Sequence, residues 1–216
     1  MNSVNMYISR DMSAMCCNVV AVPTEVIQEI IKDIEQQNPA VILPDWPARR
    51  ISVFPKDDVP LLVFDEDNLS VKTLRWGYEP SWSKSVLFNT RVETASGQDR
   101  SFWTESLLER RCVVPTLGFY EPHSYETIPS SKTGKQIKQQ YFFELPTSSV
   151  LFIAGIYEQD HFSLMTTEPN RWMAPIHNRM PLVLAQDEVL TWFSDSYATL
   201  FDRSDVELLA SKAKAQ

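Results

Sequence analysis

The stretch LLVFDEDNLSVKTLRW, residues 61–76, decides the fold class. Two runs rich in leucine, β-branched and aromatic residues, Leu61–Phe64 and Val71–Trp76, lie on either side of the polar cluster Asp65-Glu66-Asp67-Asn68. Apolar runs of this length are typical of strands, and a short polar cluster between them predicts a turn. The stretch is therefore expected to form two strands joined by a turn.

Similar runs on both sides of this stretch predict further strands, over residues 16–22, 51–54, 86–92, 112–120, 140–144, 150–157 and 162–166. A helix is expected to open at Pro23-Thr24 and to end at Asn38-Pro39, because Val26, Ile27, Ile30, Ile31 and Ile34 follow a helical spacing. Shorter helices are predicted over residues 101–109, 187–193 and 204–212. Strands and helices do not alternate regularly, which favours an α+β fold with a mainly antiparallel, barrel-like β core and a few flanking helices.

The composition points to one globular domain. No linker divides the 216 residues, so residues 15–216 are expected to form a single domain, preceded by a polar arm over residues 1–14. No apolar run reaches the roughly 18 residues of a membrane span. The three cysteines form no C-x-x-C pair, which argues against disulfides and a zinc site and fits the reducing cytoplasm. A cytoplasmic monomer without metal or cofactor is expected.

The net charge of −8 restricts the ways in which this chain could bind nucleic acid. Nucleic-acid-binding domains usually carry a positive balance, which steers phosphates toward them. Any contact with DNA must therefore come from a local basic patch on an acidic body.

Met15-Cys16 is a candidate reactive segment. If Met15 is a translation start and is removed, Cys16 carries a free α-amine beside its thiol. An α-amine with a pKa near 8 is partly neutral at physiological pH, so it can condense with an aldehyde, and the thiolate can then close a five-membered thiazolidine ring. The alternative is that Cys16 and Cys17 are ordinary half-buried cysteines at the start of a strand.

Four segments in a fixed order, downstream of Met15-Cys16, resemble the SRAP family of SOS-response-associated peptidases and abasic-site-processing proteins. The resemblance covers most of the chain, from Met15 to about Phe193. The segments are Trp76-Gly77-Tyr78-Glu79-Pro80-Ser81-Trp82, Asn89-Thr90-Arg91-Val92-Glu93-Thr94, residues 110–121, and His177-Asn178-Arg179-Met180-Pro181.

The resemblance implies a protein that binds single-stranded DNA containing abasic sites and forms a covalent thiazolidine crosslink, with autopeptidase and lyase activity. It would act on the nucleoid after DNA damage. It also implies a role for individual residues. The implied catalytic residues are Cys16 (nucleophile), Asn89 (positioning the N-terminus), Glu121 and His177 (acid and base), and the implied DNA-binding residues are Arg91, Arg179, Trp76, Trp82, Pro55 and Thr166.

These residue types suit that chemistry independently of the resemblance. A carboxylate and an imidazole can move protons on and off a carbinolamine near neutral pH. Arginine makes bidentate contacts with phosphate, and tryptophan can stack on an unpaired base. Each also has an ordinary structural role open to it: Glu121 as a surface carboxylate, His177 as a capping or core residue, and the tryptophans as core.

The sequence departs from the family pattern in three places. Fifteen residues precede Cys16, and while they remain attached it has no free amine. Cys17-Asn18 stands where the family usually has glycine and arginine, and Pro122-His123 replaces the aromatic residue that commonly follows the glutamate. The usual Asn-x-Ala-Pro segment reads Ser52-Val53-Phe54-Pro55 here.

Two other functions remain open. Cys16 activated by His177 could hydrolyse peptide or amide bonds. A non-catalytic DNA or protein adaptor would fit the retained arm and Asn18.

Overall fold

The predicted strand pair is a long antiparallel hairpin in the computed structural model, which describes residues 18–36, 51–97 and 101–214. Strand β3 (Asp58–Asp65) pairs with β4 (Asn68–Trp76) from one end to the other, closing at the pair Asp65↔Asn68. The two turn residues, Glu66 and Asp67, have φ of 49° and 68°. Positive φ at both central residues gives the turn a twist that matches the flanking strands.

The described strands belong to one twelve-stranded sheet. Its other strands are β1 (Asn18–Ala21), β2 (Ser52–Val53), β5 (Asn89–Arg91), β6 (Arg111–Pro129), β7 (Gln136–Glu144), β8 (Leu151–Glu158), β9 (His161–Thr167), β10 (Met180–Pro181), β11 (Val183–Leu184) and β12 (Leu209–Lys212). The helices are α1 (Thr24–Glu35), α2 (Val92–Ala95), α3 (Thr104–Glu109) and α4 (Val189–Phe193), with 3₁₀ turns η1 (Gln186–Glu188) and η2 (Tyr197–Leu200).

Five of these strands close into a ring. Strand β6 pairs antiparallel with both β3 and β8, and β8, β9, β4 and β3 follow one another around the ring. The contact between β4 and β9 is parallel, as is that between β5 and β9, whereas the other strand pairs of the described chain are antiparallel. The expected α+β fold with a barrel-like core is confirmed, although the ring is not a complete barrel.

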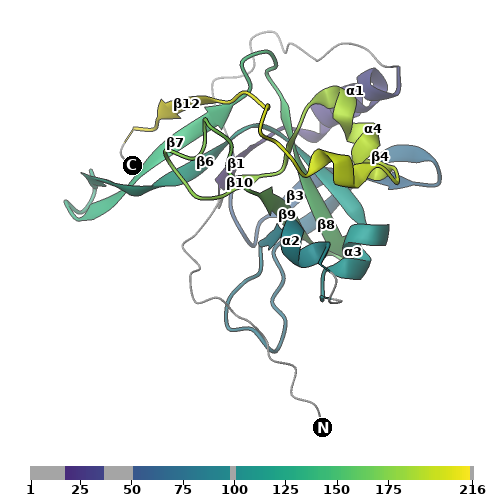
Figure 1. Ribbon diagram of the computed structural model, residues 1–216, viewed down its shortest axis with the longest axis horizontal. Coiled ribbons are helices and arrows are strands. Elements are labelled where there is room, and N and C mark those ends of the chain that lie inside the picture. Colours follow the sequence, from purple (N-terminus) through teal and green to yellow (C-terminus); the bar gives the residue numbers. More distant parts are fainter. Residues whose placement is uncertain (1–17, 37–50, 98–100, 215–216) are drawn as a thin grey trace.

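Both faces of the ring are buried, which explains the continuous apolar runs in its strands. Leu61 and Val63 belong to one hydrophobic cluster and Leu62 to the other, because successive side chains of a strand point to opposite faces. Every strand of the ring contributes to the first cluster, which contains no residue of the described helices and so fills the interior. The second cluster contains the buried apolar residues of the helices, and these helices pack against the outer face of the ring (Figure 1).

Helix α1 confirms the predicted amphipathic helix. Val26, Ile27, Ile30 and Ile34 are buried against the outer cluster and Ile31 is half-buried, and burying one such side chain contributes about 1.5–3 kcal/mol. Pro23 precedes its first turn, where a missing N–H leaves no hydrogen bond unmade.

The prediction of a helix over residues 204–212 is wrong. This segment ends in β12, which pairs antiparallel with β7. Val206 and Leu208, two positions apart, both pack against the interior cluster, whereas Leu209 is 46% exposed. This is the period of a strand, and the edge of β7 supplies the backbone partners that a sequence pattern does not reveal. The predicted arm over residues 1–14 lies outside the described residues.

Candidate active site

Glu121 is a carboxylate buried at the point where β6 leaves the ring. It follows Phe119 on the same face of the strand, and Phe119 belongs to the interior cluster. Its exposed fraction is 0%. A carboxylate this deeply buried is costly unless polar groups compensate it, so its neighbours decide what it can do.

His177 is the neighbour that the structure brings to Glu121, across 56 residues of sequence. Its Nδ1 lies 3.4 Å from Glu121 Oε1, and the ring is also buried. The same Nδ1 lies 3.3 Å from both the carbonyl oxygen and the backbone nitrogen of Arg179. The Arg179 N–H can donate to an unprotonated Nδ1, whereas a protonated Nδ1 can donate to the Arg179 carbonyl or to Glu121, so the site accommodates both neutral tautomers.

The segment that carries His177 is held by backbone hydrogen bonds. The His177 N–H donates to the Met173 carbonyl at 3.0 Å, and the Ser124 N–H of β6 donates to the Ile176 carbonyl at 2.8 Å. Burial lowers the pKa of His177, and its hydrogen bond with the Arg179 carbonyl only partly opposes that shift. The imidazole is therefore neutral at pH 7 and able to accept a proton.

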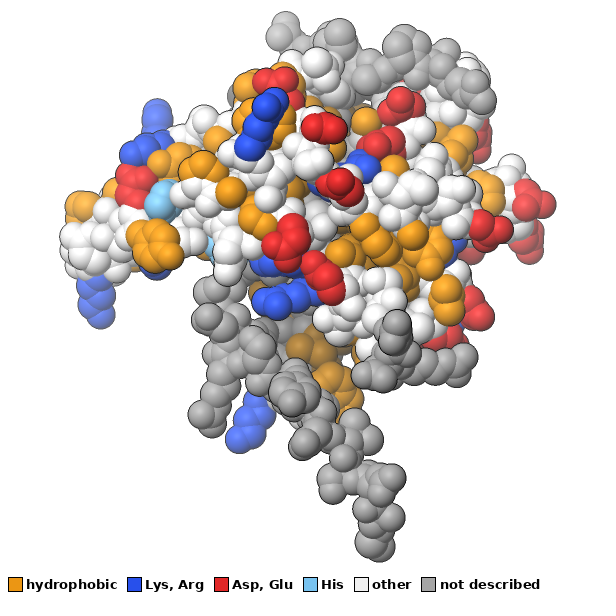
Figure 2. Space-filling view, in the orientation of Figure 1, with side chains coloured by type: hydrophobic (Ala, Val, Ile, Leu, Met, Phe, Trp, Pro, Cys, Tyr) orange, Lys and Arg blue, Asp and Glu red, His pale blue; other side chains and the backbone are white. Residues whose placement is uncertain are grey.

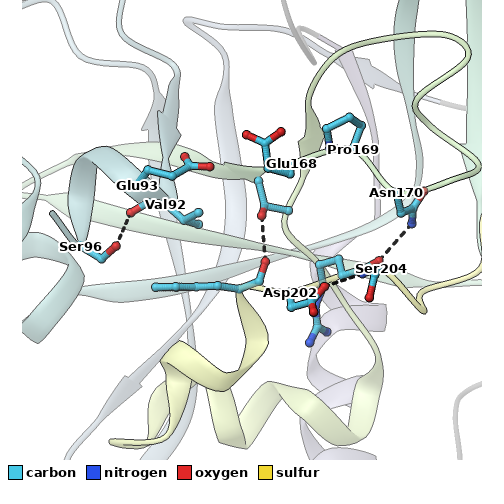
Figure 3. Close-up of a pocket in the computed structure, with 11 residues that line it drawn as sticks. Val92, Glu93, Ser96, Glu168, Pro169, Asn170, Asp202 and Ser204 are labelled. Atoms are coloured by element: carbon cyan, nitrogen blue, oxygen red, sulfur yellow. Dashed lines mark hydrogen bonds between the residues drawn. The ribbon is translucent and has the colours of Figure 1, made fainter.

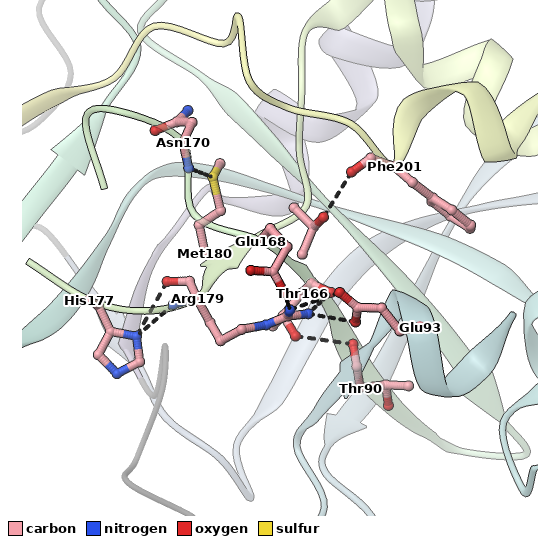
Figure 4. Close-up of polar contacts among 10 residues, drawn as sticks. Thr90, Glu93, Thr166, Glu168, Asn170, His177, Arg179, Met180 and Phe201 are labelled. Carbon is pink, nitrogen blue, oxygen red and sulfur yellow. Dashed lines mark hydrogen bonds and ion pairs between the residues drawn. The ribbon is translucent and has the colours of Figure 1, made fainter. Parts of the chain in front are cut away.

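Arg179 lies at the centre of a cluster of carboxylates (Figure 4). Its Nη1 and Nη2 each donate to one oxygen of Glu93 at 2.8 Å, and Nη1 also contacts Glu168 at 2.5 Å. Nη2 donates to the Thr166 carbonyl at 3.0 Å. Only 7% of the Arg179 side chain is exposed. The guanidinium therefore has two carboxylates as partners before any phosphate approaches it.

The pKa of Glu93 reflects this arrangement. Burial by itself would raise it, but the hydrogen bond from Arg179 and the positive charges of Arg179 and Arg91 outweigh burial and hold it below its usual range. Glu93 is thus ionised at neutral pH.

Strand β5 presents Asn89 and Arg91 beside this cluster. It runs parallel to β9, with Asn89 opposite Leu164 and Arg91 opposite Thr166. Asn89 is half-buried and the Arg91 side chain is exposed. Of the two arginines predicted to bind DNA, Arg91 is thus the accessible one.

The residues predicted to form the rest of the DNA surface divide into two groups. Trp76 and Thr166 are 0% exposed, and the Trp76 indole donates to the Phe88 carbonyl at 2.9 Å inside the core. Their burial corrects the prediction that these side chains contact DNA. Trp82 is 49% exposed and meets Phe102 edge to face at 6.0 Å. Pro55 is half-buried at the turn after β2.

Cys16 lies outside the described residues, so its position relative to Glu121 and His177 stays a prediction. The described chain begins at Asn18 in β1, which pairs with Tyr120, the residue before Glu121. Cys16 stands two residues before this strand in the sequence.

A pocket of about 420 Å³ opens beside the Arg179 cluster (Figure 3). Glu93, Glu168 and Asp202 line it, together with Phe201 and Arg203. No sequence motif assigned a function to Glu93 or Glu168. Only the fold brings Glu93 to Arg179, because 86 residues separate the two. The described residues contain no group of three or more His, Cys, Asp or Glu side chains placed to hold a metal ion. Likewise, none of the described helices is long and apolar enough to cross a membrane.

The sequence of this chain has identifiable relatives. The family model described as SOS response associated peptidase (SRAP) matches residues 15–215. The abasic site processing protein YoaM of Bacillus subtilis is 30% identical over 66% of this chain, and the match spans 65% of YoaM, just under two thirds of its length. YoqW of B. subtilis, also named an abasic site processing protein, is 29% identical over 74% of each chain.

The fold is also found in solved structures. A crystal structure of a Bordetella bronchiseptica protein superposes with a TM-score of 0.66 at 18% identity, covering 92% of this chain and 100% of that one. A Bacteroides thetaiotaomicron protein gives a TM-score of 0.63 at 21% identity, covering 92% of each chain. At these identities the likeness concerns the fold.

Proposed function

Since the chain belongs to the SRAP family, the SOS response associated peptidases, we propose that it processes abasic sites in single-stranded DNA. The curated relatives are named for the processing of abasic sites. One observation carries the proposal for this chain: a buried carboxylate and a neutral imidazole, Glu121 and His177, lie 3.4 Å apart. They lie at the end of the sheet where β1 begins, two residues after Cys16 in the sequence.

The proposed reaction joins Cys16 to the ring-opened aldehyde of an abasic site. The free α-amine of Cys16 adds to the aldehyde carbon, and the carbinolamine loses water to give an imine. The thiolate then attacks the imine carbon, a C–S bond forms, and the imine nitrogen takes up a proton, which closes the thiazolidine. Each step moves a proton, and Glu121 and His177 are the groups proposed to move them. Asn89 is proposed to hold the N-terminal amine in place.

Removal of residues 1–15 is a precondition of this chemistry. While Cys16 is inside the chain its nitrogen is an amide, which cannot form an imine. We propose that translation starts at Met15, which is then removed, or that the chain is cut after Met15, the second route being an autopeptidase reaction. The domain over residues 15–216 would then begin at Cys16 and act as a cytoplasmic monomer, with the proposed lyase activity at the same site.

The first test compares two forms of the protein on a single-stranded oligonucleotide that contains one abasic site. A chain that begins at Cys16 should form an adduct that survives denaturing electrophoresis and has the mass of protein plus DNA minus one water. The full-length chain should form none. If intact mass finds no adduct with the processed chain, the reaction is absent, and a non-catalytic adaptor describes this protein better.

The DNA surface is proposed to include Arg91 and Trp82, because both side chains are exposed. Arg91→Gln should weaken binding to single-stranded DNA and reduce the slope of log K against log salt by about 0.7, the value for one lost phosphate contact. Arg179→Gln should act differently, because it leaves Glu93 and Glu168 without their cation. It should lower the melting temperature, and by much more than Arg91→Gln does. Titrations at several salt concentrations and thermal melts measure both effects. A salt slope unchanged by Arg91→Gln would remove this residue from the DNA surface.

A further inference from the structure

Beyond the pair Pro122↔Gln140, strands β6 and β7 continue as a two-stranded arm, residues 122–140, which projects from the body of the molecule (Figure 1). Its outer part is held by the pairs Thr127↔Lys138, Ile128↔Ile137 and Pro129↔Gln136. At the tip, the Ser130 N–H donates to the Lys135 carbonyl at 2.8 Å. The tip is therefore a formed turn that presents its side chains in defined directions.

The arm is positively charged on an acidic protein. It contains three lysines, Lys132, Lys135 and Lys138, and one carboxylate, Glu126. Glu126 already receives hydrogen bonds from Lys212 and from Tyr141, which lower its pKa. In Figure 2 blue side chains stand out at the left-hand end, toward which the arm points, whereas red ones lie over the middle and the right-hand end. The arm is therefore a local basic element on this face.

Two of these lysines are available to a partner. Lys138 donates to the Ser124 carbonyl and so supports the arm itself. Lys132 and Lys135 are exposed, and neither forms an ion pair with any described carboxylate. Lys56 and Lys72, by contrast, pair with Glu79 and Asp65 on the body.

The arm also carries the most exposed aromatic side chain among the described residues. Tyr125 is 87% exposed, with the ring of His123 at 6.5 Å. An exposed aromatic among lysines is the combination that binds single strands, because bases stack on the ring while the cations contact phosphates.

The arm is joined directly to the candidate active site. The strand that carries Glu121 is the strand that becomes the arm, and the Ser124–Ile176 hydrogen bond ties the base of the arm to the segment that carries His177. Glu121 pairs with Tyr141 and Pro129 with Gln136, so along β7 the arm spans five positions, a reach of about 17 Å at about 3.3 Å per strand residue. That length corresponds to roughly five stacked nucleotides at 3.4 Å each.

We propose that this arm binds the DNA backbone that flanks the lesion, about five nucleotides from it, through Lys132 and Lys135, with Tyr125 stacking on a base. The inference rests on the proposed function and extends it. It assigns to an acidic protein a local basic surface in addition to Arg91, and it predicts that DNA length affects affinity.

The test measures equilibrium binding of the full chain to single strands of 5 and 20 nucleotides, each with one central, chemically stable abasic analogue. Lys132→Gln/Lys135→Gln should reduce the salt slope on the long strand by about 1.4, the value for two phosphate contacts, and should leave the short strand unaffected. A third probe is the long strand with a duplex flank. On this probe the same double variant should reduce the salt slope by about 1.8 if the arm contacts duplex DNA. Tyr125→Ala should weaken binding of the long single strand alone.

The matched control is Lys32→Gln/Lys72→Gln, which removes the same charge from α1 and β4. Equal losses in the control and the arm variant, or equal losses on both lengths, would overturn the proposal in favour of a general charge effect. Crosslinking by a chain that begins at Cys16 is measured in parallel on a 5-nucleotide strand that carries a true abasic site, because the stable analogue has no aldehyde. If crosslinking fails while the arm variant still reduces the salt slope, the proposed reaction is wrong and DNA binding by the arm is supported. If crosslinking occurs and the arm variant leaves the salt slope unchanged, DNA binding by the arm is wrong and the proposed reaction is supported.

Discussion

Cys16→Ala, in a chain that begins at this residue, is expected to abolish crosslinking to abasic DNA. Alanine retains the α-amine but has no thiol, so the imine can form only reversibly and no ring closes. Cys17→Ala should leave crosslinking largely intact, because the thiol of residue 17 is not adjacent to the free amine. Denaturing electrophoresis and intact mass measure both variants. Equal loss in the two would place the reactive thiol elsewhere.

Glu121→Gln and His177→Gln should slow the same reaction by roughly 10²–10⁴, the usual contribution of proton transfer by a positioned side chain. The wild-type rate should fall as the pH drops well below neutrality, because the α-amine, with a pKa near 8, becomes protonated. Burial lowers the pKa of His177, so its imidazole remains a base after the amine has been protonated. Single-turnover rates from pH 5 to pH 8 test this, with thermal melts to exclude unfolding. If both variants fold and react at the wild-type rate, Glu121 and His177 do not transfer protons in this reaction and have only a structural role.

Gly118→Ala should cause a large loss of stability. Gly118 has φ of 153°, and a Cβ there would lie 2.2 Å from Phe142 Cζ and 2.5 Å from the Phe143 carbonyl oxygen. Overpacking and backbone strain together are expected to cost about 3 kcal/mol or more, which lowers the melting temperature by about 6–12 °C for a chain of this size.

The control is Gly134→Ala at the tip of the arm, where φ is 68° and nothing lies within 4 Å of the added Cβ. Only the strain of a left-handed backbone conformation applies at this position, so Gly134→Ala should lower the free energy of unfolding by about 1–2 kcal/mol. Thermal or urea unfolding of both variants measures the difference. A Gly134→Ala variant as unstable as Gly118→Ala would show that the close approach of β6 and β7 is not what requires glycine.

Local patterns in the sequence were sufficient for the strand pairs and for α1. The continuous apolar run that begins at Leu61 reflects a strand buried on both faces, and the 3.6-residue period of residues 26–34 reflects a helix buried on one face. The same reasoning failed for residues 204–212. There the apolar residues Val206, Leu208 and Leu209 are too few to separate a helix from a strand, and the free edge of β7 decided the outcome.

The ordered segments of the sequence determined by themselves the family, the fold class and the choice of Glu121, His177, Asn89 and Arg91 as candidates. Only the tertiary structure decided which of the candidates meet and which are accessible. It placed Glu121 against His177, enclosed Arg179 between Glu93 and Glu168, and buried Trp76 while leaving Trp82 exposed. The physical reason is that contacts between residues tens of positions apart depend on strand pairing and on the shared burial of both faces of the ring. Neither leaves a periodic signal in the sequence around any one of those residues.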